Sequence, residues 1–89
     1  MSTHTGKIGR LPKRLREEVN QRLDNGEPGA EILVWLNGLP PVQAVLAARF
    51  GGKPISASNL THWRTGGHQE WQKEQARMVA LLDLMRNPS

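Results

Sequence analysis

Apolar residues recur along this chain at the spacing of helix faces. The first stripe repeats every four residues and consists of Leu11, Leu15, Val19 and Leu23. Pro12 suits the first turn of that helix, and Asp24-Asn25-Gly26 is expected to end it. No segment alternates apolar and polar residues in the manner of a β-strand. The pattern predicts an all-α chain.

Two further helices are expected before Gly52. The first follows Pro28, ends at Asn37-Gly38 and should be largely buried, because its apolar residues are dense: Ile32, Leu33, Trp35, Leu36 and Leu39. The next helix begins with Pro41 and ends at Gly51-Gly52. Its apolar face holds Val42, Val45, Leu46 and Phe50, while Ala44, Ala47 and Ala48 would let a neighbouring helix approach closely.

A short helix from Ala57 to about Thr65 carries the most complete start signals in the chain. The Ser56 hydroxyl is expected to accept the N–H of Asn59, and Ile55 to pack on Leu60 as a hydrophobic staple. Gly66 and Gly67 follow this helix at the position where a residue in the left-handed conformation commonly ends a helix. Leu60 and Trp63 should face the core, since they are three residues apart, although an exposed indole would stack on a nucleic-acid base.

A last helix from about Gln69 to Arg86 has more apolar surface than so small a domain readily hides. Trp71, Gln75, Met78, Leu82 and Met85 form one seam, with Val79, Leu81 and Leu84 beside it. Two interpretations stay open. The helix either folds back over the core or associates with another copy of the chain.

The expected architecture is a compact helix-turn-helix domain of about five short helices with a longer C-terminal helix. Residues 1–9 are interpreted as a flexible basic arm that contributes no core. Residues 10–67 form the DNA-binding domain, with Ala44 to Gly51 as supporting helix and Ala57 to Thr65 as reader. Residues 68–89 form the C-terminal helix, which serves packing or oligomerisation.

Charge placement favours a phosphate-binding surface more than the net charge of +4 does. No Asp or Glu lies between Glu31 and Glu70, whereas Arg49, Lys53 and Arg64 all do. A second basic cluster precedes the first acid, Glu17, and comprises Lys7, Arg10, Lys13, Arg14 and Arg16. Small proteins also carry such an excess as an ordinary solvated surface, and that alternative remains.

The reader helix offers side chains for base and phosphate contact. Asn59 and Arg64 carry the most sequence information, because an amide pairs with adenine and a guanidinium with guanine. Ser58, Thr61 and His62 are expected to reach bases or phosphates. The residues expected on phosphates are Lys53, Arg49, Lys7, Arg10, Lys13 and Arg14. The alternative is a plain helical hairpin with a polar outer face.

Other classes of function find little support. The chain has no Cys, and His4, His62 and His68 are scattered, so we expect no metal, no cofactor and no enzyme active site. No apolar run approaches the ~20 residues of a membrane span, and no signal-peptide pattern opens the chain. A cytoplasmic protein without membrane contact is expected.

The chain resembles the terminase small subunits of Mu-like phages through GKIGRLPKRLREEVNQRLDNGEPGAEILVWLN and the downstream PISASNL. It is also similar to short bacterial and prophage proteins that share a GGKPIS…NL…W…GG pattern. The LPPVQAVLAARFGG segment is longer than its counterpart in the phage proteins. The resemblance implies a DNA-recognition protein that oligomerises and hands viral DNA to a large terminase subunit.

The combined expectation is a non-enzymatic protein that reads double-stranded DNA for phage packaging. A transcriptional regulator would need the same reader helix and is the first alternative. The second is a protein-interaction adaptor that does not bind DNA and acts through the apolar C-terminal helix.

Overall fold

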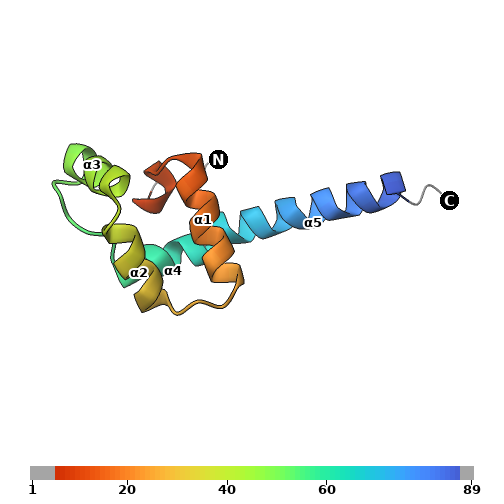
Figure 1. Cartoon of the computed structure of the whole chain (residues 1–89), viewed down its shortest axis with the longest axis horizontal. Helices are drawn as coiled ribbons and strands as arrows, with labels where there is room; N and C mark the ends of the chain where they lie inside the picture. Colours follow the sequence, from red (N-terminus) through yellow and green to blue (C-terminus); the bar gives the residue numbers. More distant parts are fainter. Residues whose placement is uncertain (1–5, 87–89) are drawn as a thin grey trace.

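The computed structural model describes residues 6–86, and all regular structure within that range is helical (Figure 1). A short 3-10 turn, η1, covers Ile8–Arg10. The α-helices that follow are α1 Lys13–Asp24, α2 Gly29–Asn37, α3 Pro40–Arg49, α4 Ala57–Thr65 and α5 Gly67–Arg86. The predicted all-α fold is confirmed, and the helix starts lie within about two residues of the expected ones.

The core forms around α4, which packs against η1, α2 and α5, while α1 and α3 each pack on α2. Each predicted apolar stripe before α5 supplies buried side chains, namely Leu11, Leu15, Val19, Ile32, Leu36, Val42, Leu46, Ile55, Leu60 and Trp63. Helices α1 to α4 are individually too short to be stable in water, so their stability comes from this shared apolar surface.

The N-terminal segment takes part in this core, contrary to expectation. Ile8 is 2% exposed and belongs to the apolar cluster. The Lys7 ammonium donates a hydrogen bond to the Pro54 carbonyl at 3.0 Å, which holds η1 against the segment that precedes α4. The interpretation of residues 1–9 as an arm without core is therefore wrong at Ile8, and residues 1–5 lie outside the described range.

The helix that supports α4 is α2 rather than α3. Ala44, Ala47 and Ala48, which were expected to admit a close neighbour, are exposed. Gly51 and Gly52 end α3 as predicted, with φ of 62° and 77°, and the Gly52 N–H bonds to the Leu46 carbonyl at 2.9 Å. This exit separates α3 from α4 by an extended connection, so Ala44–Gly51 does not act as the supporting helix.

Asn37 fixes the connection that leads into α4. Its side chain accepts the Ile55 N–H at 2.8 Å and donates to the Ile55 carbonyl at 3.0 Å. One amide thus satisfies both backbone groups of a residue 18 positions away in the chain, in the manner of a neighbouring β-strand. The start of α4 is thereby tied to the end of α2.

The expected N-terminal cap of α4 is confirmed and is more complete than predicted. The Ser56 hydroxyl accepts the Asn59 N–H at 3.2 Å, and Asn59 Oδ1 accepts the Ser56 N–H at 2.9 Å. These reciprocal bonds make a capping box. Ile55 and Leu60, the expected staple pair, are both buried.

The predicted left-handed exit of α4 is wrong. Gly66 has φ −119° and ψ −90°, and Gly67 is already the first residue of α5. Gly67 is instead required so that the Trp63 indole can pack against the α5 backbone, because a Cβ at this position would overlap the ring. A single residue therefore separates α4 from α5.

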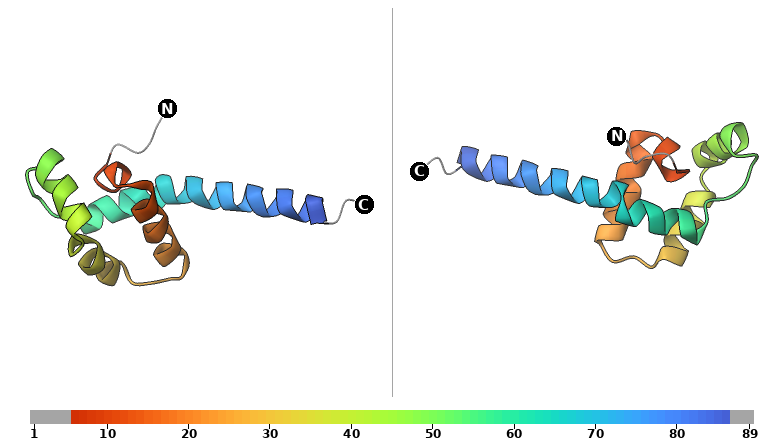
Figure 2. Two further views of the ribbon diagram at one scale, coloured as in Figure 1. Left: turned by 45° about the horizontal axis from the view of Figure 1, so that its top comes forward. Right: turned by 180° about the vertical axis from the view of Figure 1, so that it is seen from behind.

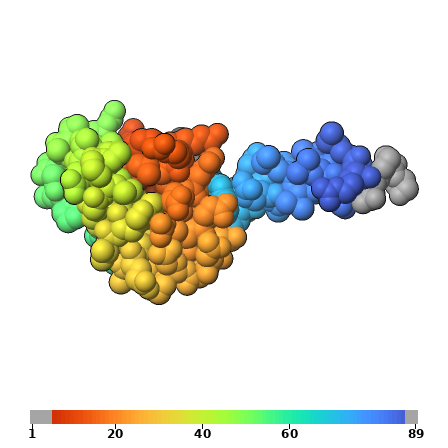
Figure 3. Space-filling model, viewed as in Figure 1, coloured from red at the N-terminus to blue at the C-terminus, as the bar shows by residue number. Residues whose placement is uncertain are grey.

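Helix α5 leaves the globular part and projects from it (Figures 1 and 2). The principal extents of 55 × 28 × 21 Å reflect this projection, which the space-filling view also displays (Figure 3). Its outer half does not fold back over the core. Within residues 6–86, no single helix meets the length and apolarity that a membrane crossing requires, although the bent pair of α2 and α3 does so jointly.

Replacing Gly67 by Ala should lower stability, whereas Gly→Ala inside a helix ordinarily raises it by ~0.5 to 1 kcal/mol. The new methyl group would displace the Trp63 ring at a cost of ~1 to 3 kcal/mol. Urea unfolding measures the change. Gly6→Ala, where an added Cβ meets no atom within 4 Å, is the control, and a Gly67→Ala variant as stable as the control would contradict this packing.

Candidate nucleic-acid interface

One side of α4 is anchored and the other is open. Leu60 and Trp63 are buried, at 3% and 7% exposure. Ser58, Thr61, His62 and Thr65 recur at helical spacing and are all exposed; we call these four the outer face of α4. The predicted split between residues that hold the helix and residues that meet solvent is confirmed for Leu60, Trp63, Ser58 and His62.

The capping box changes the role of Asn59. Its Oδ1 accepts both the N–H of Ser56 and the hydroxyl of Ser56, at 2.9 and 3.0 Å. Bidentate pairing with adenine needs that same oxygen as an acceptor. Asn59 is therefore a capping residue in this structure, and the expectation that it is a principal base reader is not supported by its geometry. Thr61 is also engaged, since its hydroxyl donates to the Ala57 carbonyl at 3.0 Å.

Arg64 is the exposed cation of α4 itself. It borders a hollow of about 300 Å³ between α2 and α4, which is also lined by Gly29, Ala30 and Thr61. A Cβ at Gly29 would lie 3.3 Å from Leu60 Cδ2, so this glycine allows α2 to pack closely on α4. Arg64 thus lies on the α2 side of α4, beside the outer face.

Three of the remaining predicted contacts lie near the connection that leads into α4. Arg49 and Lys53 are exposed on the α3 side of the connection into α4. Lys7 is half-buried and occupied, because it bonds to Pro54 and lies 5.8 Å from the centre of the Phe50 ring.

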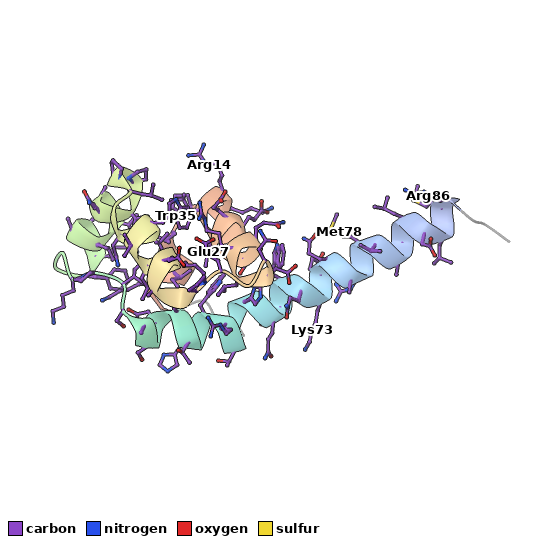
Figure 4. All side chains as sticks on the ribbon, turned by 60° about the horizontal axis from the view of Figure 1, so that its bottom comes forward. Arg14, Glu27, Trp35, Lys73, Met78 and Arg86 are labelled. Carbon is purple, nitrogen blue, oxygen red and sulfur yellow. The ribbon has the colours of Figure 1, made fainter. Side chains whose placement is uncertain are left out.

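Of the remaining predicted phosphate contacts, Arg10, Lys13 and Arg14 are exposed, and Lys13 lies 4.0 Å from Glu17. Arg14 points away on the side opposite α4 (Figure 4). Arg14 is therefore remote from the outer face of α4.

A buried polar cluster holds the inner side of α4, and sequence reasoning missed it. Asn20 Oδ1 accepts the Trp63 Nε1–H at 2.8 Å and lies 3.1 Å from His68 Nδ1. Because the oxygen is only an acceptor, His68 Nδ1 carries the proton. His68 also stacks on Trp71, with ring centres 5.6 Å apart. The partners are 43 and 48 residues from Asn20, so no local pattern indicates the cluster.

Burial lowers the pKa of His68 below its ordinary value, because the charged imidazolium loses hydration. The nearby Asp24 carboxylate opposes this shift, and the Arg64 guanidinium adds to it. The neutral ring, with Nδ1 as donor to Asn20, is therefore the form that the folded protein favours. Among residues 6–86, no three His, Asp or Glu side chains are grouped to hold a metal ion.

Comparison with known proteins gives no relative: no family model, no curated protein and no solved structure matches the chain. Function is therefore inferred from the chemistry of the described residues.

Stability should fall as the pH drops through the ordinary histidine pKa of about 6.5. The unfolded chain takes up a proton at His68 there, while the folded protein resists protonation until lower pH, so acid favours unfolding. Thermal unfolding between about pH 8 and pH 5 measures the effect. A His68→Gln variant keeps an N–H donor for Asn20 but does not titrate, and it should lose part of the pH dependence. Identical pH profiles for both proteins would refute this role of His68.

Proposed function

We propose that this protein binds double-stranded DNA through the outer face of α4. One observation carries the proposal: α4 is fixed on its inner side by Leu60 and Trp63, and its opposite side is exposed, polar and without acidic side chains. A helix held in this way presents a rigid, uncovered surface of the width that the DNA major groove admits.

The side chains divide between two kinds of contact. Arg64 is the candidate for reading guanine, because its guanidinium is exposed and has the geometry for two parallel bonds to one base. His62 and Ser58 belong to the outer face and supply shorter-range donors and acceptors, whereas Arg64 flanks this face on the side of α2. Arg49 and Lys53 precede α4 and serve the phosphates, which fixes the register of the helix in the groove.

The proposed biological role is recognition of viral DNA for packaging, in the manner of a terminase small subunit. The GKIGRLPKRLREEVNQRLDNGEPGAEILVWLN and PISASNL resemblance supports this role over transcriptional regulation, which would use the same contacts. A large terminase subunit is the partner that this role requires. Co-purification with such a subunit tests the role separately from DNA binding.

Affinity for duplex DNA should fall steeply with salt, because each phosphate contact releases counterions. A pool of random-sequence duplexes, enriched by binding to the full chain, supplies a preferred site and its scrambled control. Binding is then followed by fluorescence anisotropy at several salt concentrations. An adaptor that acts only through α5 would show no binding even at low salt, and that result would exclude the proposal.

Arg64→Ala and Lys53→Ala should have different effects. Loss of Arg64 should reduce the preference for the selected site by roughly 5- to 150-fold, the equivalent of ~1 to 3 kcal/mol. Loss of Lys53 should weaken binding to the selected and the scrambled duplex equally. It should also reduce the slope of log affinity against log salt concentration by about one. Arg86→Ala removes the same charge at the far end of α5 and is the control. Equal specificity in the Arg64 variant and the control would remove Arg64 from the site.

A further inference from the structure

The outer half of α5 exposes a concentration of large apolar side chains. Met78, Val79, Leu81, Leu82, Leu84 and Met85 are 50% to 78% exposed. Exposed apolar surface of this extent on a projecting helix ordinarily marks a binding surface. The end of α5 touches no other described element that would cover it, as Figures 1 and 3 illustrate.

The spacing of these residues specifies a helix as the occupant. Trp71, Gln75, Met78, Leu82 and Met85 follow each other at intervals of four, three, four and three residues. This is the repeat with which two helices interlock at a shallow crossing angle. We call these five residues the α5 seam. Leu84 lies on the opposite side of the helix, outside the seam.

The part of the seam nearest α4 lines a groove that is already present in the single chain. A cavity of about 490 Å³ lies between α1 and α5, and its walls include Lys13, Arg16 and Glu17 from α1 and Trp71, Gln75 and Met78 from α5. Met78 projects from α5 on the side where α1 lies, and Lys73 projects from the other side (Figure 4). We call this cavity the α1–α5 groove.

We propose that a second copy of this chain fills the groove, so that two α5 helices pair in antiparallel orientation, with Leu82 of each copy against the partner's Trp71. Because α1 forms one wall of the groove, only a helix with no other helix packed beside it can enter. The outer half of α5 is such a helix. In a parallel pair, each groove would instead face the inner half of the other α5, where that copy's α1 is in the way.

The available area suits a second copy. Full burial of one Val, Leu or Met side chain removes roughly 60 to 120 Å² from water. The exposed apolar side chains of both copies therefore offer several hundred Å². Trp71 and the groove walls add to this area and bring it toward the ~1,200 Å² at which specific interfaces begin. In a two-fold symmetric dimer the same seam of each copy contacts the other copy, so no end of either seam is left unpaired. This inference does not depend on DNA binding.

The mass of the full chain in solution tests the pairing. We expect about twice 9.9 kDa by light scattering at tens of micromolar protein. Leu82→Glu should give the mass of one chain, since it places a charge in the seam. Leu84→Glu adds the same charge outside the seam and should stay dimeric. Circular dichroism checks that both variants fold. A single-chain mass for the unmodified protein, or equal behaviour of the two variants, would overturn the proposal.

Disulfide formation tests the orientation, because the chain contains no Cys of its own. In the antiparallel pair, two copies of Leu82→Cys lie about 16 Å apart along the axis, too far for a disulfide. The double variant Trp71→Cys/Leu82→Cys should instead cross-link two chains under mild oxidation. A disulfide in the single variant, or none in the double variant, would refute the antiparallel register.

Discussion

The indole of Trp63 is held at both ends of its ring system. Its Nε1–H donates to Asn20 on α1 over 2.8 Å, and its six-membered ring lies against Gly67 at the start of α5. Trp63 itself belongs to α4, so one side chain joins three helices. The same Asn20 oxygen also contacts His68 Nδ1, so a displacement of Asn20 would disturb both bonds. The orientation of α4, and hence of its outer face, depends on this arrangement.

Local features of the fold could be predicted, because their causes lie within a few residues of each other. The apolar stripe of α1, the Gly51-Gly52 exit and the Ser56 cap all follow from spacing and from the backbone preferences of Gly and Ser. Gly67 marks the limit of such reasoning. A pair of glycines after a helix suggests an exit, and only the position of Trp63 reveals that the second glycine permits close packing.

The candidate site was predictable in outline for the same reason. The absence of acids around α4 is visible in the sequence, and so is the separation of Leu60 and Trp63 from Ser58 and His62. The use of the Asn59 side chain was not decided by sequence, because an amide three residues after Ser56 suits both a capping box and a base contact. The hydrogen bonds between the Asn37 amide and Ile55 could not be predicted, because the two residues are 18 positions apart in the sequence.

The single-residue junction between α4 and α5 has a mechanical meaning. Gly66 is the one residue between the two helices, and the contact of Trp63 with Gly67 sets the angle between them. Helix α5 is 20 residues long, or about 30 Å. It therefore acts as a lever whose fulcrum lies beside the candidate DNA-reading surface. A rotation of about one degree at Gly66 displaces the far tip by roughly 0.5 Å, so a small reorientation of α4 becomes a larger displacement at the opposite end of the molecule.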